Sequence, residues 1–417
     1  MPRPPRSASA SVSAPNAASR PSARRPVSSS DPADLTGRVR SAVGAVVDPE
    51  LRRPLSELDM IADVRAADGE IVVAVSLTIV GCPASDRIER EVAAAAAAVA
   101  DRPVRVELGV MTPAQRAALT ERLRAGRPRG IPFTADSLTR VIAVTSGKGG
   151  VGKSTVTANL AVALAARGLT VGLVDADVHG FSIPGILGLV DAEGRMPHPT
   201  RIDDLIVPPV AHGVKTISIG MFLREGEERS PVAWRGPMLH RTLQQFLTDV
   251  WFGDLDVLLI DMPPGTGDVA ISLGQLLPHA EVLVVTTPQA AAAEVAVRSG
   301  LVARQTGQRV IGVIENMAPL RLPDGTVLDL FGSGGGQAAA SALSQGDGDE
   351  VPLVASVPLS PALRTGGDTG SPVTLSAPAD PAAAEILRLA DTLARRPRGL
   401  AGRSLRVGVS TQVASES

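Results

Sequence analysis

The chain has a single cysteine, Cys82, among its 417 residues, it has no tyrosine, and aromatic residues make up only 2% of it. One thiol excludes an intramolecular disulfide framework and a C-x-x-C metal site. No apolar run is long enough to span a membrane, and residues 1–33 lack the hydrophobic segment of a secretory signal. We therefore expect a cytoplasmic protein with no membrane partner.

Charge is nearly balanced, because 41 basic and 43 acidic residues leave a formal net charge of −2. This balance lacks the basic excess of a nucleic-acid-binding protein, so we expect no nucleic-acid partner. Residues 1–33 are rich in Arg, Ser, Ala and Pro. An organelle transit peptide has the same bias, but the frequent prolines favour a disordered tail.

The pattern along the chain predicts two domains of different kinds. In the first, an apolar β-branched strand at 71–79 stands among helical stretches, which is typical of a small α+β domain. In the second, short apolar strands alternate with helices, which predicts a doubly wound, mostly parallel α/β sheet covered on both faces. The expected boundaries are a tail at 1–33, the α+β domain at 34–120, a linker at 121–137, the α/β domain at 138–400 and a C-terminal tail at 401–417.

The most informative segment follows a predicted strand at 141–145 and fits the pattern G-x-x-x-x-G-K-S. Its glycines let the backbone fold into a nest of amide groups around phosphate oxygens, and the N-terminus of the following helix faces the same anion. The sequence therefore predicts a P-loop that binds ATP with Mg²⁺. The residues expected to bind the nucleotide are Gly147, Lys148, Gly149, Gly150, Val151, Gly152, Lys153, Ser154 and Thr155.

Within this loop we expect Lys153 to bridge the β- and γ-phosphates, Ser154 to place its hydroxyl on Mg²⁺, and Thr155 to help hold the α-phosphate. Lys148 is additional to an ordinary P-loop. The chain contains only two other lysines, Lys153 and Lys215, which argues against a casual solvated lysine. We expect Lys148 to act catalytically by reaching across a two-fold axis to the partner's phosphates.

Carboxylates close two further predicted strands of the α/β domain. Asp175 ends the strand at 171–175 and Asp177 follows it, and Asp261 closes the strand at 256–261. Parallel strands deliver their carboxyl ends to the ligand side of a sheet. We expect Asp175 and Asp261 to hold Mg²⁺ and Asp177 to orient or activate the attacking water. Asn316 also ends a strand, and its amide suits the adenine edge, although a turn residue is an equal reading.

Together these motifs resemble the Mrp/ApbC-type ATPases, the iron–sulfur cluster carrier branch of the MinD/ParA-like deviant P-loop proteins. Asp48-Pro-Glu50 and the segment from Leu77 to Pro83 resemble the small iron–sulfur assembly domain often fused in front of such ATPases. The segments that carry the main resemblance are 147–154, 175–180, 234–238, 261–268, 315–317 and 331–332.

The resemblance implies an ATP-hydrolysing homodimer that carries an iron–sulfur cluster to apoprotein clients, and it implies the cross-dimer role of Lys148. One departure matters: the family usually carries a C-x-x-C pair after Glu-Asn-Met, whereas residues 318–330 contain no cysteine. Two subunits would supply two thiolates, both Cys82, which is too few for four-thiolate ligation. Two alternatives therefore stay open, an ATP-gated scaffold that carries no cluster and a MinD/ParA-like positioning ATPase.

Cys82 follows an apolar strand and precedes Pro83. At the start of a helix its thiolate would be stabilised by the helix N-terminus, which suits ligation of a metal or of an iron–sulfur cluster. A buried structural cysteine is the equal alternative.

Overall fold

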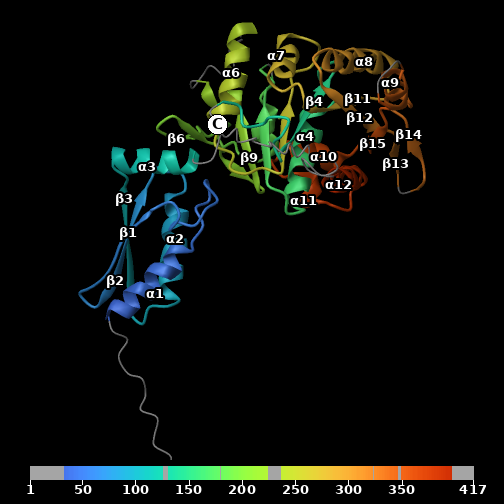
Figure 1. Ribbon diagram of the computed structural model, residues 1–417. Helices are drawn as coiled ribbons and strands as arrows, with labels where there is room; N and C mark the ends of the chain where they lie inside the picture. The colour runs from blue at the N-terminus through green and yellow to red at the C-terminus, as the bar shows by residue number, and fades with distance from the viewer. Residues whose placement is uncertain are drawn as a thin grey trace, which may run out of the picture.

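The computed structural model describes residues 32–124, 130–178, 180–223, 236–322, 324–345 and 349–396. They form a small domain, residues 32–124, and a large domain, residues 130–396, which Figure 1 shows as the blue-to-teal part below and the green-to-red part above. The predicted disordered tail at 1–33 and C-terminal tail at 401–417 lie outside the described residues, apart from the first residues of the first helix.

The small domain is a three-stranded sheet, in the order β1-β2-β3, packed against helices. Its elements are α1 (Pro32–Gly44), β1 (Ile61–Ala67), β2 (Glu70–Leu77), α2 (Ser85–Ala97), β3 (Val104–Val110) and α3 (Pro113–Arg124). Strand β1 is not predicted from the sequence, because its alternation of apolar and polar residues is weak. Asp68 and Gly69, both with positive φ, join it to β2 in the two-residue turn typical of a hairpin, and that pair is the signal that could have found it.

The large domain is built on an eight-stranded sheet with the order β15-β12-β11-β4-β10-β5-β9-β8, in which all pairs are parallel except β8 with β9. This confirms the predicted mostly parallel α/β fold. The strands of the sheet are β4 (Arg140–Ser146), β5 (Val171–Asp175), β8 (Val210–Ala211), β9 (Val214–Ser218), β10 (Val257–Asp261), β11 (Glu281–Thr286), β12 (Arg309–Ala318) and β15 (Leu353–Pro358).

Helices cover both faces of this sheet (Figure 1). The helices are α4 (Lys153–Ala165), α5 (Ser182–Ile186), the 3-10 turn η1 (Ile219–Phe222), α6 (Gly236–Thr248), α7 (Asp268–Leu276), α8 (Ala290–Gln305), α9 (Gly335–Leu343), α10 (Pro361–Asp368), α11 (Val373–Ser376) and α12 (Pro381–Ala394). Alternate residues of β4 enter different cores, because successive side chains of a strand point to opposite faces. Val141 and Ala143 pack with α6 to α9, whereas Ile142 and Val144 pack with α4 and α12.

The two domains share one apolar cluster. It joins the core of the small domain to Ile202, Leu205 and Val207 of the hairpin β6 (Thr200–Ile202) and β7 (Leu205–Val207), and to Trp251. The Trp251 indole Nε1 donates to the Leu123 carbonyl oxygen at 3.3 Å. Two ion pairs lie beside the cluster, between Arg116 and Asp203 and between Arg124 and Asp204. The domains are therefore joined by packed surface as well as by the chain.

Several short elements of the large domain were not anticipated from the sequence. They are α5, α9, α10, α11 and the small hairpins β6–β7 and β13–β14, the last formed by Leu320–Arg321 and Val327–Leu328. Their apolar patterns are too short for periodicity to distinguish helix from strand.

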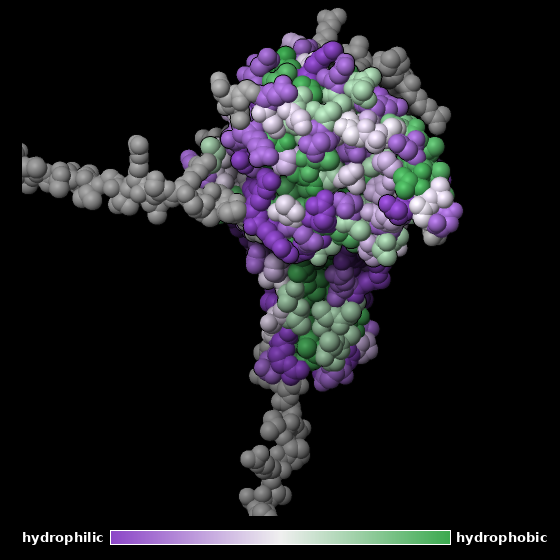
Figure 2. Space-filling model, turned by 90° about the vertical axis from the view of Figure 1, so that its right-hand side faces the viewer, coloured by the Kyte–Doolittle hydropathy of each residue, from purple (hydrophilic) through white to green (hydrophobic). Residues whose placement is uncertain are grey.

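On the face seen in Figure 2, hydrophilic and hydrophobic residues are interspersed over the large domain. Among the described residues no helix is both long and apolar enough to cross a bilayer.

Candidate functional site

The segment 147–152 turns sharply between β4 and α4. Gly150 and Gly152 both have φ of 79°, a left-handed conformation that glycine adopts without strain, and Gly152 caps the N-terminus of α4. Gly147 packs against the backbone of α8, where an added Cβ would lie 2.2 Å from the carbonyl carbon of Val295. The loop therefore packs against α8 and leads directly into α4.

Lys153, the first residue of α4, is only 5% exposed, and its ammonium lies 2.7 Å from Oδ2 of the fully buried Asp261. The Ser154 hydroxyl donates to the same carboxylate oxygen at 2.5 Å, and the Thr157 hydroxyl donates to the other oxygen at 2.9 Å. Burial raises the pKa of Asp261, while the Lys153 ammonium and the two hydroxyls act in the opposite direction. The loop and the end of β10 therefore form one charged cluster.

Asp175 ends β5 directly beside Asp261, because the two residues are partners in the parallel register of β5 and β10. Its side chain is fully buried and accepts from the Ser218 hydroxyl at 2.9 Å and from the Asp177 backbone amide at 3.2 Å. Burial, and next the neighbouring Asp261, raise the pKa of Asp175 well above its ordinary value. Asp177 approaches the same centre, with Oδ2 3.6 Å from the Lys153 ammonium.

A cavity of about 270 Å³ lies over this cluster. Its wall includes the phosphate loop from Lys148 to Thr155, together with Asp177, Ser182 and Pro264. The structure thus brings the loop and Asp177 to one cavity, with Asp175 and Asp261 buried behind it. A backbone nest, an ammonium, a hydroxyl and buried carboxylates are the groups that hold a nucleoside phosphate with its metal ion.

Lys148 adopts a different position from Lys153. Its ammonium donates to Oε1 of Gln289, the residue that precedes α8, at 3.0 Å. The Lys148 carbonyl oxygen accepts from the Ser146 hydroxyl, which fixes the backbone at the start of the loop. The two lysines of the loop are therefore tied to different elements.

Asn316 is buried, and its side-chain amide donates to the Val151 carbonyl oxygen at 2.8 Å. In this arrangement the residue supports the phosphate loop from β12, and the expected contact with adenine stays a prediction. The neighbouring Glu315 accepts from the Gly336 amide and the Ser356 hydroxyl, so it links β12 to α9 and β15.

Cys82 lies far from the phosphate loop in the chain, in the turn between β2 and α2, and it is 4% exposed. It does not begin the helix, because α2 starts at Ser85. Burial, with smaller contributions from the Glu50 and Asp48 carboxylates, raises the pKa of the Cys82 thiol to about 11. The helix N-terminus therefore does not activate this thiol in the conformation described here.

The surroundings of Cys82 connect the two domains. Its sulfur lies 3.8 Å from Oε2 of Glu50, and Oε1 of the same carboxylate accepts from the hydroxyl of Thr200 in the large domain at 2.9 Å. Within the described residues no group of three or more His, Cys, Asp or Glu side chains is arranged to hold a metal ion. The segment in which the resemblance places a C-x-x-C pair forms instead the hairpin β13–β14, which has no cysteine.

Sequence reasoning missed four polar partners of the site, namely Thr157, Ser218, Gln289 and Thr200. Thr157 follows Lys153 by one helical turn, and Ser218 ends the strand next to β5, so periodicity and strand ends could have indicated both. No local pattern could have indicated Gln289 or Thr200, because their partners are distant in the chain.

Comparison with known proteins supplies independent findings. A family model described as the NUBPL iron-transfer P-loop NTPase of the ParA group matches residues 137–394, and a model described as an iron–sulfur cluster assembly protein matches residues 37–108. The iron–sulfur cluster carrier protein of Mycobacterium tuberculosis (strain H37Rv) is 54% identical over 379 residues, which cover 89% of this chain and 96% of that protein.

The iron–sulfur cluster carrier protein of Synechocystis is 39% identical over 363 residues, covering 86% of this chain and 97% of that protein. Among solved structures, a nucleotide-binding protein from Archaeoglobus fulgidus in complex with ADP is 34% identical, covers 57% of this chain and 91% of that chain, and has a TM-score of 0.45.

Gly147→Ala should destabilise the protein even without nucleotide, since the new Cβ would overlap the backbone of α8 near Val295. Thermal melting of the nucleotide-free protein should show a fall of several degrees, which corresponds to about 1–3 kcal/mol of strain. Gly149→Ala is the matched control, because a Cβ there would meet only Pro264 at an ordinary 3.9 Å. Equal melting temperatures for the two variants would contradict the tight packing of Gly147 against α8.

Glu50→Gln should lower the pKa of the Cys82 thiol from about 11, because a carboxylate beside a thiolate disfavours the charged form. Cys82 is the sole cysteine and the chain has no tyrosine, so the ultraviolet absorbance of the thiolate, titrated between pH 8 and 12, reports this pKa without a phenolate background. The midpoint of the pH profile should move to lower pH in Glu50→Gln and stay in place in Glu57→Gln, a change at an exposed glutamate of the same domain. An unshifted midpoint in both variants would refute the influence of Glu50.

Proposed function

The chain belongs to the family of iron–sulfur cluster carrier proteins, P-loop NTPases preceded by an iron–sulfur cluster assembly domain, and from this premise we propose that it hydrolyses ATP at the loop Gly147–Thr155. The protein acts in iron–sulfur cluster assembly or transfer, and its large domain binds nucleotide. The observation that carries the proposal is the convergence of Lys153 and Ser154 on the buried Asp261.

The charged side chains around Lys153 are suited to binding the oxygens of a phosphate group. The Lys153 ammonium, now paired with Asp261, would turn to the β- and γ-phosphates, while the amides of Gly149 to Lys153 and the N-terminus of α4 surround them. Thr155 would contact the α-phosphate, and Asn316, which holds the Val151 carbonyl, would keep the loop in this shape or meet the adenine edge.

The oxygen atoms beside Lys153 fit a magnesium ion. Ser154, Asp261 and Asp175 offer a hydroxyl and two carboxylates, which are the hard oxygen ligands that Mg²⁺ prefers, and two buried carboxylates side by side need a cation for both to be charged. When bound, the ion neutralises charge on the phosphate oxygens. We assign Ser154, Asp175 and Asp261 to this role.

The chemistry assigned to this chain's residues is hydrolysis of the terminal phosphoanhydride bond. Water attacks the γ-phosphorus, the bond to the β-phosphate oxygen breaks, and ADP and phosphate leave. Asp177, which lines the cavity and lies 3.6 Å from Lys153, would orient this water and accept its proton. Lys153 stabilises the charge that develops on the departing oxygen.

Lys148 completes the proposal as a residue that acts across a homodimer. It is held by Gln289 at the rim of the loop rather than by Asp261, so its ammonium is placed for transfer to another anion. In a face-to-face dimer that anion would be the partner's triphosphate, in the manner of a finger residue. ATP binding would then bring the two subunits together, and hydrolysis would return them to their starting state. This cycle would set when the cluster is bound and when it is passed on.

The cargo is an iron–sulfur cluster passed to apoprotein clients, and Cys82 is the one thiol of this chain that could ligate it. Because that thiol is buried and its pKa is raised, ligation requires its surroundings to open. The same observation, with the hairpin β13–β14 in place of a C-x-x-C pair, favours a second candidate in which ATP gates a scaffold and the cluster is held by other proteins.

ATP turnover by paired variants tests the cross-dimer site. Lys153→Ala should lose nucleotide affinity, and Lys148→Ala should keep affinity but lose turnover by about 1,000-fold or more, as for a finger residue. Mixed together, the two inactive variants should recover about a quarter of wild-type turnover, because half of random dimers are mixed and each has one complete site. No recovery, or full activity of Lys148→Ala alone, would overturn the role across the dimer.

Anaerobic reconstitution with iron and sulfide, followed by absorbance spectroscopy, tests where the cluster is held. A carrier that uses the small domain should bind a cluster as wild type and lose it as Cys82→Ser, while both forms keep magnesium-dependent ATP binding by calorimetry. Absence of a cluster in both forms would favour the scaffold instead. Absence of ATP binding in both would remove the nucleotide proposal itself.

A further inference from the structure

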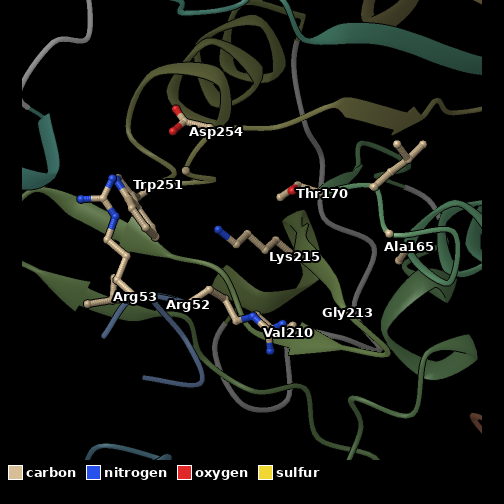
Figure 3. A pocket seen from close by; sticks show the side chains of 13 residues that line it. Arg52, Arg53, Ala165, Thr170, Val210, Gly213, Lys215, Trp251 and Asp254 are labelled. Carbon is tan, nitrogen blue, oxygen red and sulfur yellow. The ribbon is translucent and has the colours of Figure 1, made fainter. Parts of the chain in front are cut away.

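A second cavity, of about 450 Å³, lies where the two domains meet, and it is larger than the cavity of about 270 Å³ at the phosphate loop. On one side it is walled by the small-domain loop Leu51–Arg53, and on the other by residues of the large domain (Figure 3). The large-domain residues include Thr170, Gly213, Lys215, Trp251, Gly253 and Asp254.

This cavity is separate from the nucleotide site. Thr170 precedes β5, Gly213 precedes β9 and Asp254 precedes β10, so the wall is formed at the amino ends of these strands. The phosphate loop and Asp261 lie at the carboxyl ends of the parallel strands, at the opposite edge of the sheet. A ligand here would leave the nucleotide cavity accessible.

The wall carries three basic side chains, Arg52, Arg53 and Lys215, and one acidic side chain, Asp254. Lys215 is one of only three lysines in the chain, and the proposed nucleotide chemistry uses the other two. Its side chain is 5% exposed, although lysine is among the residue types least often buried. A net excess of two positive charges around one cavity favours an anionic occupant.

The basic groups converge on the cavity from both domains. The Lys215 ammonium donates to the Phe252 carbonyl oxygen at 2.6 Å and lies 4.7 Å from the centre of the Trp251 ring, and the Arg53 guanidinium carbon lies 5.8 Å from the same ring. In the view of Figure 3 the Arg52 side chain extends below Lys215. Trp251 thus fixes one cation from each domain beside the cavity.

Glycines leave three positions of the wall without side chains. Gly168, Gly213 and Gly253 all have positive φ, and a Cβ on Gly253 would lie 2.9 Å from the Lys215 ammonium nitrogen. Side chains at these positions would be strained, and at Gly253 the side chain would also crowd the ammonium. The wall combines buried charge with exposed backbone, as anion sites commonly do.

We propose that this cavity binds a small oxyanion with phosphate or carboxylate groups, held by Arg52 and Arg53 of the small domain and Lys215 of the large domain. The bound anion bridges the two domains. The loop that carries the two arginines also carries Glu50, which contacts Cys82 and the Thr200 hydroxyl. Occupancy of the cavity therefore stabilises the docked arrangement in which the Cys82 thiol is buried.

Calorimetry on the full chain tests the site while ADP saturates the phosphate loop. Magnesium is omitted, because both anionic probes chelate magnesium ions. Pyrophosphate and citrate, titrated separately at constant ionic strength, distinguish phosphate from carboxylate recognition. We expect one of them to bind once per chain. Affinity should fall at least 10-fold in Arg52→Asn, which removes the guanidinium but tolerates the positive φ of this position, and in Lys215→Met.

Arg90→Ala, at an exposed arginine on α2, is the matched control and should bind as wild type. Lys153→Ala should also bind the probe, because it changes only the other site. No binding of either probe, or binding lost in Lys153→Ala but kept in Arg52→Asn, would overturn the proposal. If the Lys215→Met variant is unfolded at the assay temperature, the test relies on Arg52→Asn alone.

The bridging step has its own measurement. Alkylation of Cys82, the only thiol, should slow severalfold when the probe binds wild type and should not change in Arg52→Asn. A probe that binds but leaves the alkylation rate unaltered would refute the bridge between domains. None of these outcomes depends on ATP hydrolysis, so they are separable from the proposed function.

Discussion

The buried ion pair between Lys153 and Asp261 is the interaction on which the arrangement of the large domain's site depends. Asp261 has no exposure to solvent, and its two oxygens receive an ammonium and two hydroxyls that all come from the first turns of α4. Breaking one side of such a pair costs about 3–5 kcal/mol, because the other charge is left buried. The pair therefore holds the phosphate loop against β10 while leaving the ammonium available to a stronger anion.

The parallel register of the sheet explains why these groups meet. Asp261 stands opposite Val144 in β4 and Asp175 in β5, so the loop strand and both carboxylate strands end side by side. A bound cation relieves the repulsion between the two carboxylates that this crowding creates. The same geometry that makes the site costly when empty makes it suited to a cation beside the phosphate loop.

The small domain adds a second constraint, because its only thiol is buried beside a carboxylate that also contacts the large domain. Glu50 joins Cys82 to Thr200, and Cys82 belongs to the apolar cluster that the two domains share. The family handles iron–sulfur clusters, yet here the segment after Glu315-Asn-Met317 is a hairpin without cysteine. The burial of Cys82 and the contact of its neighbour Glu50 with Thr200 thus tie the surroundings of this thiol to the contact between the domains.

The sequence by itself determined the fold class, the phosphate loop and the carboxylates that end β5 and β10, because glycine spacing and strand-end residues are local signals. It also located the strands β4, β5 and β10, whereas β1 and the short elements α5, α9, α10 and α11 were too brief or too weakly patterned. Only the tertiary structure decided that Gln289 holds Lys148, that Asn316 supports Val151, and that Cys82 is buried with a raised pKa. These outcomes depend on contacts between residues far apart in the chain, and on burial that no local pattern encodes.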